Sequence, residues 1–211
     1  MEKMIFVNLK MFINSKTEII NYISNLKNRN IIFLPEAIYI ETFIKEGLVC
    51  GSQSISSHEE GPYTNEISSK AVKDIGCTYC LIAHRDLRKN ETNIKEKLKL
   101  ALKYNLIPIF CVGDRKLDKQ LKNLNGLKGN IIIAYEPDWA IGRGLTPSNE
   151  KISKVINHIK KNYPHKVIYG GSVNEKNIEK LNQIKSLDGF LIASSAINYK
   201  NLIKIQEVIQ K

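Results

Sequence analysis

Short runs of apolar, often β-branched residues recur along this chain, and segments with helical periodicity separate them. The runs lie at residues 4–7, 31–34, 48–50, 79–83, 107–112, 131–135, 167–169 and 189–192. Continuous apolar runs are typical of strands buried on both faces, as in parallel sheets. In the segment 151–160, Ile152, Val155, Ile156 and Ile159 fall on one helical face, and Pro147-Ser148 is a suitable start for that helix. The alternation therefore predicts an α/β fold with a parallel sheet.

Eight strands and eight helical connections within 211 residues predict a closed (βα)₈ barrel. No stretch has the composition of a linker, so we expect a single domain over residues 1–211. The fifth helix should be short, because only residues 115–129 separate two strands, and Asn125-Gly126 should end it.

Composition excludes several classes of protein. The chain has no apolar run long enough to cross a membrane and no evident signal peptide, so we expect no membrane association and a cytoplasmic location. Cys77 and Cys80 have C-x-x-C spacing, but no second pair or nearby histidine completes a zinc site. We interpret the four cysteines as buried or half-buried structural thiols in a reducing compartment.

The formal net charge of +11 raises the possibility of a nucleic-acid partner. The lysines, however, are spread through helical segments such as 95–103 and 151–161, without a basic tail or a nucleic-acid motif. This distribution favours a solvated outer layer of helices and no nucleic-acid partner. A positive field would still speed the arrival of a small anionic substrate.

Polar residues follow five of the predicted strands, where the apolar pattern would not place them. They are Asn8-Leu9-Lys10, His84-Arg85-Asp86, Glu136, Gly170-Gly171-Ser172 and Ala193-Ser194-Ser195. Because the carboxyl ends of barrel strands meet at one face, we expect these residues to converge. Glu136 ends its strand because Pro137 cannot donate to a ladder, and a carboxylate beside an apolar loop suits a general base.

Six motifs in order along the chain carry a resemblance to a known family. They are N-x-K-M at 8–11, G-x-Y-T-x-E at 61–66, C-V-G-D at 111–114, A-Y-E-P-x-W-A-I-G-x-G at 134–144, Y-G-G-S-V-N at 169–174 and D-G-F-L-I at 188–192. Each motif alone is modest evidence, but together they closely resemble triosephosphate isomerases, over the whole length of the chain.

The resemblance implies an isomerase of the (βα)₈, or TIM barrel, fold that interconverts dihydroxyacetone phosphate and glyceraldehyde 3-phosphate without cofactor or metal. It implies that Glu136 is the base, that neutral His84 polarises the carbonyl, that Lys10 supplies positive charge and that Asn8 orients the substrate. The residues implied in substrate binding are Asn8, Lys10, Gly142, Ser172, Ala193 and Ser194, the last four through backbone N–H groups that suit a phosphate dianion. It also implies a homodimer through the loop around Thr64.

The chain departs from the family pattern after the histidine, where Arg85-Asp86-Leu87 stands for Ser-Glu-Arg. Asp86 is one methylene shorter than glutamate, so we expect it to reach Lys10 less well. We expect Arg85 to bring a cation near Glu136, which would favour the charged carboxylate and help to keep His84 neutral.

Other departures concern the loops. Ala193-Ser194 replaces two glycines, at about 1 kcal/mol or more per residue if a positive φ is needed there. Leu9 replaces a tryptophan. The loop 137–147 is the expected lid, and Pro147 directly after Thr146 predicts a stiff hinge.

Three other functions stay open from the sequence. A catalytically weakened relative that still binds a triose phosphate is favoured by Arg85 and Asp86 and opposed by the retained Asn8, Lys10, His84 and Glu136. Another phosphate-binding barrel enzyme, such as a lyase, would need its own base or Schiff-base lysine, and Lys10 is the only lysine expected at a strand carboxyl end. A nucleic-acid binder ranks last.

Overall fold

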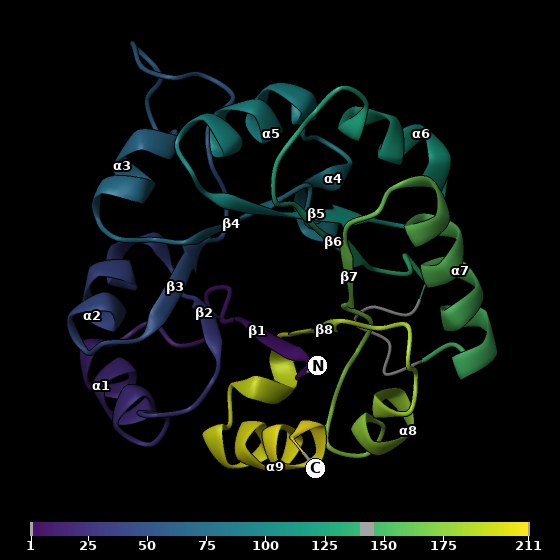
Figure 1. Ribbon diagram of the computed structural model, residues 1–211. Coiled ribbons are helices and arrows are strands. Elements are labelled where there is room, and N and C mark those ends of the chain that lie inside the picture. Colours follow the sequence, from purple (N-terminus) through teal and green to yellow (C-terminus); the bar gives the residue numbers. More distant parts are fainter. Residues whose placement is uncertain (1, 140–145, 211) are drawn as a thin grey trace.

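Eight parallel strands close into a barrel in the order of the sequence, with β1 paired to both β2 and β8, and helices surround them (Figure 1). The structure is a computed structural model that describes residues 2–139 and 146–210. The strands are β1 (Met4–Asn8), β2 (Ile32–Leu34), β3 (Val49–Ser52), β4 (Tyr79–Ile82), β5 (Ile107–Val112), β6 (Ile132–Tyr135), β7 (Lys166–Tyr169) and β8 (Gly189–Ile192). All eight coincide with predicted strands to within two residues at either end, which confirms the barrel.

The helices follow the strands as expected. They are α1 (Lys16–Ser24), α2 (Ile40–Lys45), α3 (Ser69–Asp74), α4 (Arg85–Arg88), α5 (Ile94–Lys103), α6 (Leu117–Leu121), α7 (Asn149–Asn162), α8 (Ile178–Asn182) and α9 (Tyr199–Ile209), with 3₁₀ turns η1 (Ala37–Tyr39), η2 (Lys122–Leu124) and η3 (Ser194–Ala196). The Ser148 hydroxyl accepts from the Lys151 N–H and caps α7, at the predicted start of that helix. The fifth helix is short, as predicted: α6 passes into η2, which ends at Asn125 before Gly126 at φ +79°.

Alternating strand residues divide the core into two layers. Phe6, Leu34, Ile109 and Ile168 belong to the cluster that fills the barrel. Their neighbours along the strands, such as Val7 and Phe33, belong to the larger cluster between the strands and the outer helices. Because both faces of each strand are apolar, side chains with chemistry to perform are confined to the strand ends.

The four cysteines are free and buried, in agreement with the structural interpretation. Burial raises the pKa of Cys77 to about 11, so its thiol stays protonated at neutral pH. In the part of the chain described, no helix combines the length and apolar character needed to cross a membrane.

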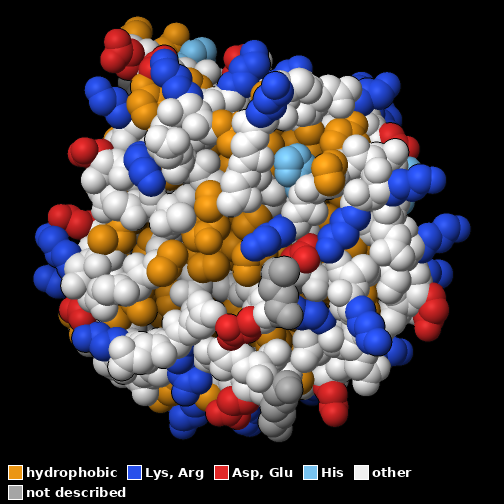
Figure 2. Space-filling model, viewed as in Figure 1, with side chains coloured by type: hydrophobic (Ala, Val, Ile, Leu, Met, Phe, Trp, Pro, Cys, Tyr) orange, Lys and Arg blue, Asp and Glu red, His pale blue; other side chains and the backbone are white. Residues whose placement is uncertain are grey.

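Lysine and arginine side chains are scattered over the face seen in Figure 2, most of them around its rim, while apolar side chains gather near its middle. On that face the positive charge forms no continuous stripe, which agrees with a solvated outer layer.

Candidate active site

The carboxyl ends of β1, β4 and β6 bring three of the predicted catalytic side chains into one network. His84 Nε2 lies 3.2 Å from Glu136 Oε1. Lys10 Nζ lies 2.7 Å from Asp86 Oδ2, and the same Oδ2 lies 3.4 Å from His84 Nδ1. Residues up to 126 positions apart are therefore joined by two carboxylates, as strand ends in a barrel allow.

Glu136 is the most enclosed charged group of this network, with only 1% of its side chain exposed. Its Oε2 accepts from the Arg85 backbone N–H at 3.0 Å and from Arg88 Nη2 at 2.7 Å. A carboxylate can be buried in this way only because donors replace the water it has lost. Gly170 makes room beside it, since a Cβ there would lie 3.2 Å from Glu136 Cγ.

His84 caps helix α4, and this contact assigns its tautomer. The Asp86 backbone N–H donates to Nδ1 at 3.4 Å. A neutral imidazole that accepts at Nδ1 carries its proton on Nε2, where the Glu136 carboxylate can accept it. In this tautomer the His84 Nε2–H can donate to Glu136 Oε1, or to another acceptor that takes the position of that oxygen.

Lys10 is held by an unusual backbone conformation directly after β1. Its φ is +48°, and its N–H donates at 3.0 Å to Asn8 Oδ1, while its carbonyl accepts from Gln53 Nε2 at 3.0 Å. A positive φ is rare for a residue with a Cβ and persists only where the surroundings hold it. Asn8, which is 3% exposed, thus shapes the turn that aims Lys10. Gln53 was missed in the sequence because it stands in none of the motifs.

Asp86 was expected to reach Lys10 less well than a glutamate would, but the shorter side chain makes a full contact with it. The two side chains meet at 2.7 Å, because the turn at Lys10 brings the ammonium group to the start of α4. Partial burial by itself would raise the pKa of Asp86, but the hydrogen bond from Lys10 and the nearby positive charges lower it below its usual value. Asp86 is therefore a charged partner of Lys10 at neutral pH.

The guanidinium in contact with Glu136 is that of Arg88, a residue that the sequence analysis did not single out. Arg88 ends α4 and lies one turn beyond His84. Arg85, the expected cation, reaches Glu136 through its backbone N–H at 3.0 Å. The expected cation beside Glu136 is thus present, but the observed ion pair is with the Arg88 guanidinium.

Cys111 of β5 adds an uncharged neighbour to Glu136. Burial first, and then the negative charge of Glu136, raise the pKa of this thiol well above its usual value. Cys111 therefore stays protonated beside the carboxylate.

The predicted phosphate-binding residues lie at the ends of β7 and β8, apart from Gly142, which lies outside the described residues. Ser172 has φ +51°, and its carbonyl accepts from Asn177 Nδ2 at 2.9 Å. The Ser195 hydroxyl donates to the Val173 carbonyl at 2.6 Å and ties the two turns together. Ala193 has φ −126°, so the cost considered for a positive φ at this residue does not arise.

The loop around Thr64 projects beyond the ring of helices, at the upper left of Figure 1. Residues 61–66 are exposed, and the Tyr63 ring stacks on His58 with ring centroids 3.7 Å apart. This stacking packs the tip of the loop against its own base.

Comparison with known proteins gives a consistent result. The sequence model of the family described as "Triosephosphate isomerase" matches residues 3–209. A triosephosphate isomerase of Wolbachia pipientis wMel is 33% identical over 233 aligned positions, covering 100% of this chain and 96% of the relative. A triosephosphate isomerase of Wolbachia sp. subsp. Brugia malayi (strain TRS) is 34% identical over 233 positions, covering 100% and 99%. One from Mesomycoplasma hyopneumoniae (strain 232) is 36% identical over 185 positions, covering 79% and 76%.

Proposed function

The chain belongs to the triosephosphate isomerase family, and we propose that it interconverts dihydroxyacetone phosphate and D-glyceraldehyde 3-phosphate, as in glycolysis and gluconeogenesis, with Glu136 as the base. The single observation that carries this assignment of roles is the 3.2 Å contact between Glu136 Oε1 and His84 Nε2 at the strand ends. It sets a buried carboxylate and an imidazole N–H side by side, one to accept a proton from carbon and the other to polarise the adjacent carbonyl.

The reaction starts when Glu136 removes a proton from C1 of dihydroxyacetone phosphate. The C–H electron pair becomes the C1=C2 double bond, and the carbonyl electron pair moves onto the C2 oxygen, which receives the His84 Nε2–H. His84, now without that proton, takes the proton of the C1 hydroxyl and so regains its starting form. The electron pair left on the C1 oxygen becomes the C1=O double bond, while the C1=C2 electron pair takes the proton back from Glu136 at C2. The product is the aldehyde, with no net consumption of protons.

Lys10 and Asn8 support the charge that develops in this reaction. The Asp86 carboxylate contacts both the Lys10 ammonium group and the His84 ring. A substrate oxygen beside His84 would therefore also lie near the positive charge of Lys10. The phosphate would bind at Gly142, Ser172, Ala193 and Ser194, where turns at the ends of parallel strands favour anions.

The contact between Asp86 and Lys10 removes one of the two reasons for expecting a weakened enzyme. The experiment is an assay of the purified chain with glyceraldehyde 3-phosphate, in which dihydroxyacetone phosphate is detected by an NADH-dependent glycerol-phosphate dehydrogenase. We expect turnover without added metal or cofactor for the isomerase itself. No turnover above the spontaneous rate would contradict the proposal.

We also propose that the chain forms a homodimer through the loop around Thr64. Its exposed tip carries Tyr63, 43% exposed, and the turn after β1 carries Met11 and Phe12, 73% and 51% exposed. Exposed apolar residues on a projecting loop and on the turn after β1 are suited to burial against a second copy. Light scattering should give about twice the chain mass, and Thr64→Glu should lower both the mass and the activity. An active monomer at micromolar concentration would contradict the dimer.

A cytoplasmic location fits the four unpaired cysteines, since a reducing compartment keeps thiols free. Cell fractionation with an antibody against the chain tests it, and recovery from a secreted fraction would overturn it.

A further inference from the structure

We propose that Arg88 is a positioning residue that holds Glu136 by Oε2 and so leaves Oε1 as the oxygen that carries the proton. The inference rests on the proposed function, since it takes Glu136 as the base. It concerns a residue that no motif in the sequence singled out.

The two oxygens of Glu136 have different surroundings. Oε2 accepts two hydrogen bonds, from Arg88 Nη2 at 2.7 Å and from the Arg85 N–H at 3.0 Å. Oε1 lies 3.2 Å from His84 Nε2. A carbonyl oxygen of the substrate would compete for the His84 Nε2–H, and its binding would release Oε1. The hydrogen bonds to Oε2 would hold the carboxylate in place while Oε1 has a free lone pair for the proton.

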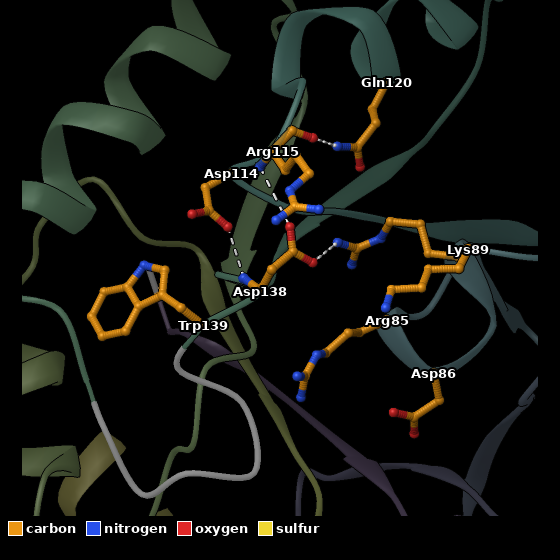
Figure 3. A pocket seen from close by; sticks show the side chains of 9 residues that line it. Arg85, Asp86, Lys89, Asp114, Arg115, Gln120, Asp138 and Trp139 are labelled. Carbon is orange, nitrogen blue, oxygen red and sulfur yellow. Dashed lines mark hydrogen bonds and ion pairs between the residues drawn. The ribbon is translucent and has the colours of Figure 1, made fainter.

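The Arg88 guanidinium is itself held by further hydrogen bonds, besides the one from Nη2 to Glu136. Its Nη1 donates to Asp138 Oδ1 at 3.1 Å and its Nε donates to the Ala83 carbonyl at 3.1 Å, and only 11% of its side chain is exposed. Asp138 in turn lies between Asp114 and Arg115 (Figure 3). Its N–H donates to Asp114 Oδ1 at 2.7 Å, and its Oδ2 accepts from the Arg115 N–H at 3.4 Å.

Gly113, just after β5, leaves space for this arrangement. A Cβ at Gly113 would lie 2.2 Å from Arg88 Nη1 and 2.5 Å from Asp138 Oδ2, distances that no native contact permits. Its φ is not in the left-handed region, so the missing side chain matters here for space. The end of β5 therefore leaves space for the Arg88–Asp138 pair. An incidental ion pair on the surface would not need a glycine at this position.

A pocket of about 720 Å³ gives solvent access to the arginine. Arg88, Asp138 and Lys89 are among the side chains that line it. Among the residues that the structure describes, Lys89 forms no hydrogen bond or ion pair with Glu136, so it supplies a matched control for the loss of one positive charge from the same pocket. Access from the pocket also means that a small cation can replace the guanidinium group if the arginine side chain is removed.

The first experiment compares Arg88→Gln and Lys89→Ala with the wild type in the isomerase assay over a range of pH. We expect Arg88→Gln to lower kcat about 30-fold, with KM changed less than about threefold. This loss is smaller than the roughly 10²–10⁴-fold that a positioned base contributes, because Glu136 itself remains. The acid limb of kcat/KM should move to higher pH, because a carboxylate that loses an adjacent cation binds a proton more readily. Lys89→Ala should match the wild type in all three quantities.

The second experiment tests position as well as charge. Arg88→Ala should regain at least about fivefold in kcat with tens of millimolar guanidinium, and not with sodium at equal ionic strength, since only a planar donor replaces both hydrogen bonds. Gly113→Ala should push Arg88 and Asp138 apart and lower kcat, and it should add little to the loss in Arg88→Gln because the two changes break the same contact.

These results separate the inference from the function on which it rests. A wild type without turnover overturns the proposed function. A wild type with turnover, together with a folded Arg88→Gln of unchanged kcat and acid limb, overturns the inference and leaves the function standing. Should the Arg88 variants fail to fold by circular dichroism, Gly113→Ala decides, and a folded Gly113→Ala with wild-type kcat and acid limb overturns the inference.

Discussion

Two ion pairs join helix α4 to the ends of other strands, and they differ in their surroundings. Lys10 and Asp86 meet at 2.7 Å with 28% and 52% of their side chains exposed. Arg88 and Glu136 also meet at 2.7 Å, but with 11% and 1% exposed. The two distances are equal, so the pairs differ in their exposure to solvent and in the number of further hydrogen bonds that their members form.

An exposed pair contributes about 0–1 kcal/mol to stability, because water and salt screen it. A buried pair is a different case, since removing one partner leaves a charge without water and typically costs about 3–5 kcal/mol. Glu136 is therefore held firmly, whereas Lys10 stays able to exchange partners. The comparison predicts that substitutions at the two pairs will have different effects on activity and on the free energy of unfolding.

The largest effect is expected for Glu136→Gln. The amide is nearly isosteric but cannot accept the proton, so kcat should fall by a factor on the order of 10²–10⁴. Arg88 keeps its contact with Asp138 at 3.1 Å, so the fold should persist in the circular dichroism spectrum. Activity within tenfold of the wild type would remove Glu136 from the role of base.

A smaller effect is expected for Asp86→Asn, which leaves Lys10 without a charged partner. We expect kcat/KM to fall about tenfold and the free energy of unfolding to change by less than about 1 kcal/mol, as for an exposed pair. Asp118→Asn is the matched control, because Asp118 forms an exposed pair with His158 at 2.7 Å on α6 and α7. A loss of more than about 3 kcal/mol in the free energy of unfolding of Asp86→Asn would show that the Lys10–Asp86 pair behaves like a buried pair.

Arg85→Ser should have a still smaller effect on the base. The substitution keeps the backbone N–H that donates to Glu136 Oε2, so the acid limb of kcat/KM should move less than in Arg88→Gln. This pair of variants distinguishes the expectation from the sequence, in which Arg85 is the cation beside Glu136, from the contact observed. An acid limb that moves more in Arg85→Ser than in Arg88→Gln would restore the first interpretation.

The smallest effect is the pH dependence of the exposed pair. The pKa of Asp86 is lowered in the folded chain, so its contribution to stability is fully present above the unfolded value of about 3.9 and is lost as the pH falls through the folded value. The difference in unfolding free energy between wild type and Asp86→Asn should thus be constant from pH 5 to 7 and vanish in stronger acid. A difference that grows as the pH falls would contradict this sign.

The barrel and the two central side chains could be predicted from the sequence because their signals are local. The run 131–135 followed by Glu136-Pro137 identifies both a buried strand and its carboxyl end, and the run 79–83 does the same for His84. Once eight such runs are assigned to a barrel, the convergence of these residues follows from the topology.

The partners of those side chains could not be predicted in the same way. The reach of Asp86 depends on the left-handed turn at Lys10, 76 residues earlier in the chain, and no pattern in 8–11 encodes its angle. Arg88 lies in a helix of four residues, too short for periodicity to show which side faces the barrel. The roles of Asp138 and Gly113 depend on the Arg88 guanidinium, which lies beside both of them.

The brevity of α4 has a consequence for how this chain can change. His84, Asp86 and Arg88 are spaced by two residues each, and one residue turns a helix by about 100°. A single insertion or deletion within 84–88 would therefore disturb the contacts of His84 and Arg88 with Glu136 and that of Asp86 with Lys10 at once. Length changes are tolerable in a projecting loop such as 61–66. In residues 84–88, by contrast, a change of length cannot alter one of the three contacts without altering the others.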